Sequence, residues 1–479
     1  MTPVTTMAGC KVAVFGLGGS GLATAEALRA GGAVVTVWDD GEAARAKAQA
    51  AGFQALDPLQ NGLSGYAALV LSPGVPLTHP KPHPVVDVAR SAGVEIIGDI
   101  ELFCREREKL CPDAPFVAIT GTNGKSTTTA LIAHLLRQAG RDVAMGGNIG
   151  TAILSLPVPA PHRIHVVECS TFQIDLTPSL NPSIGILTNL TPDHLDRHGT
   201  MSQYAAIKER LVTASTQALI GQDDDWCRAI ADRCRKAGRS VIPFTMRDGD
   251  GEGLWLRGHE VIARDQQGHV LVYPLEGIAT LRGTHNAQNA SAAIACAQAM
   301  GVAQETILAG LKTFPGLAHR MEVLGHIGPV LIVNDSKATN ADSAEKALAS
   351  YPRDLYWIIG GVAKEGGIAS LAPYFDRLAH VYLIGKAADL FKSQLPAHLP
   401  VTQSGTLDQA FADALQDAQA SGAQEPVMLL SPACASYDQF PNFEVRGARL
   451  RALAEAHPDF VPFGVSVTKN QEASHGIAH

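Results

Sequence analysis

Short apolar runs alternate with longer amphipathic stretches over the first hundred residues. The runs Val12–Phe15, Ala33–Trp38 and Ala68–Leu71 are rich in valine and leucine. Such runs are typical of buried parallel strands, and the stretches between them, such as Leu22–Ala30, predict crossover helices. The pattern predicts a Rossmann-like α/β domain at the amino terminus.

The same alternation returns twice further along the chain. Three apolar runs predict strands of a central parallel or mixed sheet: Phe116–Ile119, Ile164–Val167 and Ile184–Thr188. The Gly- and Asp-rich segment Asp248–Gly253 predicts a turn in a small strand-rich insertion. A last set of runs predicts a second Rossmann-like, doubly wound sheet: Val330–Val333, Leu355–Ile359, His380–Ile384 and Val427–Leu430.

Two changes of composition divide these patterns. The charged stretch Arg105–Leu110, followed by Pro112 and Pro115, predicts a first linker, and Pro315–Gly316 predicts a second. The predicted fold is therefore α/β with three domains, followed by a polar segment that we expect to be disordered. The boundaries are residues 1–112, 113–316 and 317–467 for the domains, and 468–479 for the tail.

A glycine-bearing turn follows the apolar run at Phe116. It reads Gly121-Thr122-Asn123-Gly124-Lys125-Ser126-Thr127 and leads into a predicted helix, Ser126–Arg137. In a strand–turn–helix, backbone N–H groups and the helix N-terminus converge on a polyphosphate, while the lysine reaches the outer phosphates. The hydroxyl of Ser126 could ligate Mg²⁺. The common pattern has a glycine where Ile119 stands, so this is a compact variant, and it predicts a P-loop ATPase-type central domain.

A second glycine motif lies near the amino terminus. Gly16–Gly21 reads G-x-G-x-x-G after a predicted strand, and Asp39 follows about 20 residues later. This motif indicates a diphosphate nucleotide more firmly than it indicates a nicotinamide, because NAD and a UDP compound present the same pyrophosphate and ribose. A tight turn without a ligand is a third interpretation.

Charged residues also follow the central strands. Glu168 stands at the end of one strand, where a carboxylate can hold Mg²⁺ directly or through water, or can be an ordinary strand-end acid. The six residues Asp193–His198 hold two acids, two histidines and an arginine, which favours site chemistry over a solvated loop. The predicted helix Tyr204–Leu211 places Tyr204 and Lys208 on one face, although Lys208 alone would be interpreted as a surface lysine.

Composition narrows the function classes. Charged residues are 18% of the 479 and the net charge is −8, which argues against a general nucleic-acid binder. The cysteines form no C-x-x-C pair, so neither a disulfide framework nor a zinc site is indicated. We expect no membrane span, because no run of about 20 apolar residues occurs. The first residues lack a basic segment before an apolar one, so we expect a cytoplasmic protein.

Taken in order, these motifs resemble the Mur ligases, which are ATP-dependent amide-bond-forming enzymes of peptidoglycan precursor synthesis. The resemblance covers about residues 11–465 and also rests on Asn148-Ile149-Gly150 and Gly283–Asn289. The carboxyl third is similar to the branch of the family that adds D-glutamate. That similarity rests on five motifs: Asn334–Asn340, Ser431–Ser436, Asp438–Phe440, Asn442–Glu444 and Arg446–Gly447.

The resemblance implies a ligase that joins D-glutamate to UDP-N-acetylmuramoyl-L-alanine through an acyl phosphate, with ATP and two Mg²⁺ ions. It implies that Lys208 is carbamylated and that the linkers near residues 112 and 316 are hinges. We expect a monomer, because such a chain closes its site between its own domains. Its implied catalytic residues are Lys125, Glu168, His194 and Lys208, and its metal ligands are Ser126, Glu168, His194 and Lys208. Its implied ATP-binding residues are Gly121, Thr122, Asn123, Gly124, Lys125, Ser126, Thr127, Asn286, Asn289, Arg320 and Asp335. UDP-substrate binding falls to Gly19, Ser20, Asp39, Ser72, Gly74 and Asn148, and D-glutamate binding to Lys337, Thr339, Lys364, Ser436 and Phe443.

The sequence departs from the family pattern in two places. Tyr437 stands where an aliphatic residue is expected, and the loop between His194 and Lys208 is one residue shorter. A nicotinamide-dependent dehydrogenase would explain only residues 11–40, and a P-loop ATPase or switch protein only residues 116–190. Within the ligases, a sister enzyme adding another amino acid and a folylpolyglutamate-type enzyme stay open, although the Gly16–Gly21 motif argues against the folate version.

Overall fold

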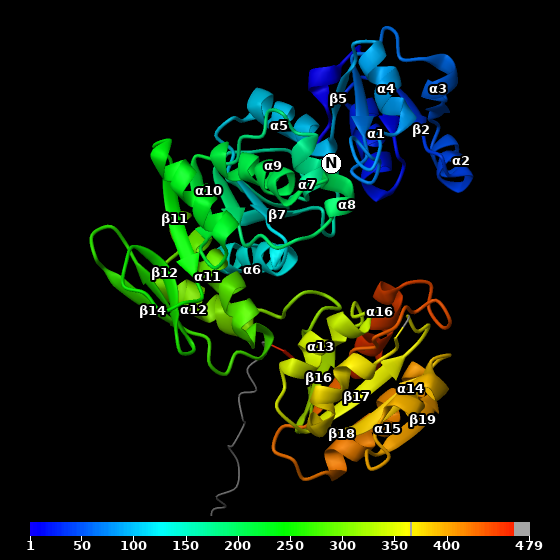
Figure 1. The fold of residues 1–479 in the computed structure, drawn as a ribbon, viewed down its shortest axis with the longest axis vertical. Coiled ribbons are helices and arrows are strands. Elements are labelled where there is room, and N and C mark those ends of the chain that lie inside the picture. The colour runs from blue at the N-terminus through cyan, green and yellow to red at the C-terminus, as the bar shows by residue number, and fades with distance from the viewer. Residues whose placement is uncertain (365, 464–479) are drawn as a thin grey trace, which may run out of the picture. The chain divides into compact units, whose positions relative to one another are not determined.

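The computed structural model describes residues 1–364 and 366–463, and the chain divides into two compact units (Figure 1). Unit 1 comprises residues 1–276 and 283–311, and unit 2 comprises residues 277–282 and the chain from Lys312 onward. The predicted tail at 468–479 lies outside the described residues. Over the described part of the chain, no helix combines the length and apolar character that crossing a membrane requires.

Unit 1 begins with a five-stranded sheet in the order β3-β2-β1-β4-β5, in which every neighbouring pair is parallel. This is the strand order of a Rossmann half, as predicted. Its strands are β1 (Lys11–Phe15), β2 (Val34–Trp38), β3 (Gln54–Ala55), β4 (Ala68–Leu71) and β5 (Glu95–Ile97). Its helices are η1 (Thr5–Met7), α1 (Gly19–Ala30), α2 (Glu42–Ala50), α3 (Pro58–Asn61) and α4 (Pro84–Ser91).

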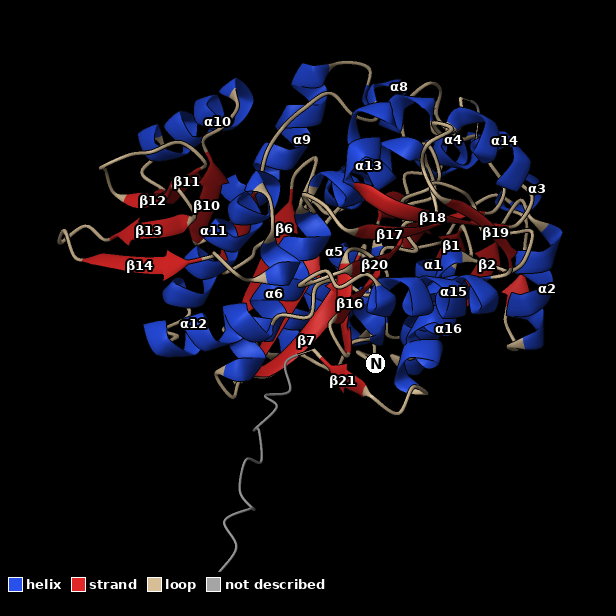
Figure 2. Ribbon diagram, turned by 90° about the horizontal axis from the view of Figure 1, so that it is seen from below, coloured by secondary structure: helices blue, strands red, loops and turns tan. Residues whose placement is uncertain are grey.

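The second sheet of unit 1 has nine strands in the order β14-β13-β12-β11-β10-β9-β6-β8-β7. It is parallel from β7 to β12, and β12, β13 and β14 form the antiparallel insertion that the sequence predicts (Figure 2). Its strands are β6 (Phe116–Thr120), β7 (Asp142–Gly147), β8 (Arg163–Glu168), β9 (Ile184–Leu187), β10 (Gln217–Gly221), β11 (Ser240–Thr245), β12 (Gly253–Arg257), β13 (Glu260–Arg264) and β14 (Val270–Pro274).

Helices cover this sheet, and α6 packs against α11. They are α5 (Asp99–Leu110), α6 (Lys125–Gln138), η2 (Ile153–Ser155), α7 (Thr171–Asp175), α8 (Leu195–His198), α9 (Met201–Thr213), α10 (Asp225–Lys236), α11 (Thr284–Ala299) and α12 (Gln304–Thr313). Because β6 is flanked by β8 and β9, the loops after these three strands meet at one edge of the sheet.

The prediction of a linker at Arg105–Leu110 is wrong, because these residues are the last turns of helix α5. The helix packs against the central sheet, with 5.4 Å between the ring centroids of Phe103 and Phe116. Glu106 is fully buried, and its carboxylate accepts a hydrogen bond from the hydroxyl of Thr5 at 2.9 Å. The charge of Glu106 is therefore satisfied inside the fold instead of by water, whereas Glu108 and Lys109 are exposed.

Unit 2 holds a seven-stranded sheet in the order β19-β18-β17-β20-β16-β15-β21. The five strands from β19 to β16 are parallel, and β15 and β21 add antiparallel strands at one edge. The strands are β15 (Glu322–Ile327), β16 (Val330–Asn334), β17 (Leu355–Gly360), β18 (Leu378–Ile384), β19 (Val401–Gly405), β20 (Val427–Leu430) and β21 (Phe460–Pro462). The helices are η3 (Ala279–Leu281), α13 (Ala341–Ala349), η4 (Ala369–Arg377), α14 (Ala388–Gln394), α15 (Leu407–Ala420) and α16 (Phe443–Glu455). The α/β class with three sheets is confirmed.

Candidate active site

The phosphate loop, residues Gly121–Thr127, connects β6 to α6. Gly121 has φ +149°, and a Cβ there would lie 1.9 Å from Oγ1 of Thr188. Gly124 has φ +83°, and its Cβ would lie 2.1 Å from Oδ1 of Asn289. Both positions therefore exclude a side chain on two counts, conformation and space. The amino group of Lys125 donates to the carbonyl oxygens of Gly121 at 3.0 Å and Thr122 at 2.8 Å.

The loop rests on the end of the neighbouring strand β9. The backbone N–H of Asn123 donates to Oδ1 of Asn189 at 2.9 Å, and the hydroxyl of Thr188 donates to the carbonyl of Asn123 at 2.7 Å. The hydroxyl of Thr122 lies 3.0 Å from that of Tyr204. Sequence reasoning assigned no role to Thr188 or Asn189, although their position after a central strand is the signal that could have found them.

Helix α11 contacts the phosphate loop and the first turn of α6. Asn289 is 2% exposed, and its Oδ1 accepts a hydrogen bond from the hydroxyl of Thr128 at 3.3 Å. Its amide donates to Oδ1 of Asn286 at 3.2 Å. The two asparagines assigned by the family resemblance are thus brought against the loop's first helical turn.

Glu168 ends β8, beside the phosphate loop. The register pairs it with Ile119, the second-last residue of β6. The amide of Asn148 donates to its Oε1 at 2.8 Å, whereas its Oε2 is buried without a hydrogen-bond partner. A buried carboxylate oxygen that lacks a donor is costly unless a cation or donor completes it.

Lys208 is buried in α9, contrary to the surface interpretation of this residue taken alone. Its side chain is 2% exposed, and Nζ donates to Oγ1 of Thr120 at 3.1 Å and to the carbonyl of Gly121 at 2.8 Å. Burial lowers the pKa of the ammonium well below its ordinary value, and the charge of Lys125 lowers it further, while Asp193 acts in the opposite direction.

The two histidines of the Asp193–His198 segment differ. His194 has φ +51°, and its half-exposed ring lies 3.5 Å from the carboxylate of Asp193. His198 is buried, with Nε2 at 2.8 Å from the hydroxyl of Thr171, and burial lowers its pKa to about 4. His194 is therefore the histidine of this segment that an incoming ligand can reach.

The amino-terminal loops form a second cradle in unit 1. The carboxylate of Asp39 accepts hydrogen bonds from the backbone N–H groups of Leu17 at 2.6 Å and Gly41 at 2.8 Å, so it ties two loops together. A Cβ on Gly16 would lie 2.5 Å from that of Ser72, which places the Ser72–Gly74 loop against the glycine motif. Gly19 and Ser20 begin α1, at its positive end.

An arginine links this cradle to the central sheet. The guanidinium of Arg197 donates to the carbonyl of Gly74 at 3.2 Å and lies 4.6 Å from the ring centroid of Phe172. The loop that carries His194 is thereby held next to the loop assigned to the UDP substrate.

In unit 2, Asp335 follows β16 and is 4% exposed. Its carboxylate accepts hydrogen bonds from the hydroxyl of Ser431 at 2.7 Å and from the N–H of Met321 at 3.1 Å. Burial raises its pKa to about 7, against the opposing effect of these bonds and of Arg320. Arg320 is exposed and lies between His319 and Met321, which both have positive φ.

Four of the residues assigned to D-glutamate lie on loops that follow unit 2 strands, and the fifth, Phe443, begins α16. Nζ of Lys337 lies 5.7 Å from the ring centroid of Phe443. Ser436 is buried, Thr339 is half-buried and Lys364 is exposed. Tyr437, the departure from the family pattern, is 75% exposed.

Arg446 organises these loops and was not assigned a role from the sequence. It is 1% exposed, and its guanidinium donates to the carbonyls of Ser336 at 2.9 Å and Cys434 at 3.0 Å. Burial lowers its pKa to about 10. Its place three residues after Phe443 on α16 was the available signal.

Comparisons with known proteins show which protein families this chain resembles. Residues 119–297 match the family described as Mur ligase middle domain, and residues 319–434 match the Mur ligase, glutamate ligase domain. The chain is 57% identical over 463 residues to UDP-N-acetylmuramoylalanine–D-glutamate ligase of Brucella abortus, covering 96% of this chain and 99% of that one. It is also 57% identical to the enzyme of the same name from Agrobacterium fabrum, covering 93% and 95%.

Solved structures share the fold. The UDP-N-acetylmuramate-alanine ligase of Thermotoga maritima matches with a TM-score of 0.57 at 18% identity, covering 93% of this chain and 99% of that one. A UDP-N-acetylmuramoyl-L-alanyl-D-glutamate–2,6-diaminopimelate ligase matches with a TM-score of 0.56 at 18% identity, covering 95% of each chain.

Proposed function

We propose that this chain, which belongs to the Mur ligase family, joins D-glutamate to UDP-N-acetylmuramoyl-L-alanine with the hydrolysis of ATP to ADP and phosphate. The observation that carries the proposal is 57% identity over nearly the full length of ligases with that name. Neither a dehydrogenase nor a bare ATPase fits a chain that matches these ligases over 96% of its length. The nucleotide substrates support a cytoplasmic location, and we propose a monomer.

The reaction has two covalent steps. The free carboxylate of the muramoyl-alanine substrate attacks the γ-phosphorus of ATP, the bond to ADP breaks, and an acyl phosphate forms. The amine of D-glutamate then attacks the acyl carbon, the bond to phosphate breaks, and the amine loses its proton as the amide forms. The first step brings two anions together, so it needs concentrated positive charge.

Residues of unit 1 supply that charge. Lys125 and the N-terminus of α6 lie within the phosphate loop, where they stabilise the β- and γ-phosphates. Asn286 and Asn289 hold the loop in shape from beneath. Gly19, Ser20, Asp39, Ser72 and Gly74 hold the UDP part, and Asn148 holds the muramoyl-alanine part while donating to Glu168.

We propose that Glu168 and Ser126 hold one Mg²⁺ ion. The unpartnered Oε2 of Glu168 and the hydroxyl of Ser126 are hard oxygen donors, which Mg²⁺ prefers. Bound there, Mg²⁺ would neutralise phosphate charge. In the described ranges 1–364 and 366–463, no three His, Cys, Asp or Glu side chains converge on a metal.

We place a second Mg²⁺ between His194 and Lys208. Lys208 carries an ammonium that donates to two oxygens, so it can support a metal only after carbamylation. Its burial, which lowers the pKa of the ammonium, favours the neutral amine that this modification requires.

Unit 2 supplies the residues that bind the incoming amino acid and some of those that bind the nucleotide. Arg320 acts on phosphate and Asp335 towards the ribose. Lys337, Thr339, Lys364, Ser436 and Phe443 surround D-glutamate, whose carboxylates call for cations and hydroxyls. The domains bounded at residues 112 and 316, with hinges near both positions, are part of the same proposal.

The test is phosphate release from Mg·ATP with UDP-N-acetylmuramoyl-L-alanine and one of D-glutamate, L-glutamate, L-lysine or no amino acid. We expect release only with the nucleotide-sugar and D-glutamate together. Equal release without either acceptor would leave a bare ATPase. Release with a different amino acid would keep the mechanism and move the chain to a sister step.

A further inference from the structure

The connector, which we define as Gly277–Arg282, belongs to unit 2 although the chain on both sides of it belongs to unit 1. The chain therefore passes between the two units three times, after Glu276, after Arg282 and after Leu311. Two of these passages flank the connector, and the second of them, after Arg282, leads back into unit 1.

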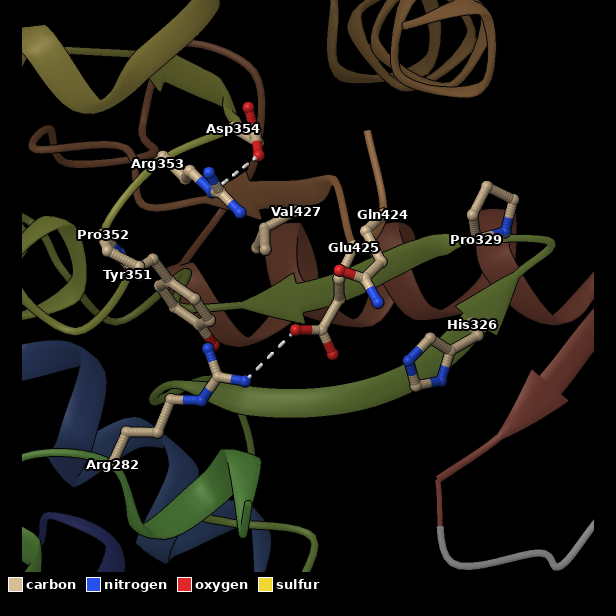
Figure 3. Close-up of a pocket in the computed structure, with 10 residues that line it drawn as sticks. All are labelled: Arg282, His326, Pro329, Tyr351, Pro352, Arg353, Asp354, Gln424, Glu425 and Val427. Atoms are coloured by element: carbon tan, nitrogen blue, oxygen red, sulfur yellow. Dashed lines mark hydrogen bonds and ion pairs between the residues drawn. The ribbon is translucent and has the colours of Figure 1, made fainter. Parts of the chain in front are cut away.

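The side chains of Thr280 and Arg282 both contact unit 2. The hydroxyl of Thr280 donates to the carbonyl of Phe314 at 2.6 Å, in a buried position. The guanidinium of Arg282 donates to Oε2 of Glu425 at 3.4 Å, and its central carbon lies 5.1 Å from the ring centroid of Tyr351. Figure 3 shows the Arg282 guanidinium beside Tyr351 and joined by a dashed line to Glu425.

The two contacts of Arg282 border a pocket of about 650 Å³ in unit 2. The pocket lies where β17 and β20 begin, at the opposite end of these strands from the loops assigned to D-glutamate. Tyr351 is fully buried and so offers a fixed surface, whereas the side chains of Arg282 and Glu425 are 29% and 51% exposed. Loss of an ion pair with this exposure changes a conformational equilibrium constant by roughly two- to five-fold.

The connector leads directly into α11, the helix whose Asn289 contacts the phosphate loop. Arg282 is followed by Gly283 and then by α11, which begins at Thr284. Asn289, on the second turn of α11, accepts the hydrogen bond from Thr128 and occupies the space beside Gly124. Asn289 therefore lies only seven positions after Arg282 along the chain.

We propose that Arg282 is a positioning residue for ATP binding: by anchoring the connector to Glu425 and Tyr351, it restrains the start of α11 and with it the support of the phosphate loop. This inference rests on the proposed ATP site at Gly121–Thr127. Arg282 touches neither substrate nor reacting atoms in this role. When the anchor is lost, a smaller fraction of molecules has the supported loop, and apparent ATP affinity falls by that fraction.

The test uses full-length variants in the phosphate-release assay. Arg282→Gln and Glu425→Gln should each raise the KM for ATP by about two- to five-fold. The value of kcat should stay within about two-fold, because saturating ATP selects the supported loop. The charge-reversed double variant Arg282→Glu/Glu425→Arg should return KM to near the wild-type value, as coupled partners require.

The matched control is the other ion pair of the same pocket. The guanidinium of Arg353 lies 3.4 Å from the carboxylate of Asp354, the same separation as the Arg282–Glu425 pair, but neither residue belongs to the connector. Arg353→Gln should leave KM for ATP unchanged. Equal KM values for Arg282→Gln and Arg353→Gln, or a double variant without rescue, would overturn the proposal.

Hydrogen–deuterium exchange separates this inference from the proposed function. In nucleotide-free Arg282→Gln, amides of the connector and of the first turns of α11 should exchange about two- to five-fold faster than in wild type, while β17 and β20 keep their rates. A wild-type protein that fails to turn over ATP would sink the proposed function and leave this readout intact. Unchanged exchange in an active enzyme would reject the anchor alone.

Discussion

Replacing Gly124 with alanine tests the support of the phosphate loop. Gly124 has φ +83°, and an added Cβ would lie 2.1 Å from Oδ1 of Asn289. The asparagine must then move, which breaks its hydrogen bonds with Thr128 and Asn286. We expect Gly124→Ala to weaken ATP binding because the loop's shape depends on that asparagine.

The magnitude comes from two contributions. A non-glycine residue in the left-handed region costs about 1 kcal/mol. Losing two buried hydrogen bonds costs about 1 kcal/mol each. If ATP binding must restore the hydrogen-bonded arrangement, the latter contribution of about 2 kcal/mol corresponds to a roughly 30-fold rise in the dissociation constant for ATP.

Isothermal titration with a non-hydrolysable ATP analogue measures this change. Gly140→Ala is the matched control, because Gly140 has φ +71° but a Cβ there would meet no atom within 4 Å. It should carry the conformational cost alone and lower the thermal midpoint without altering ATP affinity.

A double-mutant cycle completes the test. Asn289→Ala removes the side chain that collides with the new Cβ, so its effect and that of Gly124→Ala should be strongly less than additive. Gly124→Ala binding ATP as tightly as Gly140→Ala, or simple additivity with Asn289→Ala, would refute the reasoning.

Three further predictions concern single side chains. Glu168→Gln should keep the hydrogen bond from Asn148 but lower the affinity for Mg²⁺ in the presence of ATP at least ten-fold. Titration of phosphate release with Mg²⁺ measures this affinity, and an unchanged titration would exclude Glu168 as a metal ligand. Asp335 has a folded-state pKa of about 7, above its unfolded value, so its contribution to stability is full below about pH 4 and is lost as pH rises through 7. Asp335→Asn should therefore stabilise the protein at pH 8 relative to wild type by an amount on the order of 4 kcal/mol. Urea unfolding of both proteins at pH 5 and pH 8 measures this difference in the free energy of unfolding. An equal difference at both pH values would contradict the assigned burial of Asp335. Tyr437→Leu should leave the KM for D-glutamate within about two-fold, because Tyr437 is 75% exposed, and a larger change would place that ring in the amino acid site.

The strands that the sequence predicted were recognisable because they are short, continuous apolar runs, most of them buried on both faces. Val12–Phe15, Phe116–Ile119 and Val427–Leu430 all lie within strands of the structure. The phosphate loop and the position of Glu168 at a strand end were predictable for the same reason, since a residue that comes directly after a buried strand must lie at the edge of the sheet. The antiparallel strand β15 was missed because its sequence, Glu322–Ile327, interrupts the apolar pattern with glycine and histidine.

Features that depend on distant partners could not be predicted. The charges of Arg105–Leu110 indicated a linker because their partners, such as Thr5 for Glu106, lie 101 residues away. The buried Arg446 depends on Ser336, 110 residues before it. Lys208 was ambiguous alone because helical spacing does not reveal which face a fold buries. In each case the folded environment, and not the local sequence, determines whether a charge is solvated.

The connector also has a consequence for biosynthesis. Arg282 and Glu425 are 143 residues apart, so a ribosome adding about 5–20 residues per second makes the docking partner roughly 7–30 s after the arginine. Both sheets of unit 1 and helices α11 and α12 are synthesised before that partner exists. The nascent chain thus carries both sheets of unit 1 while its connector still lacks the partner that holds it on unit 2.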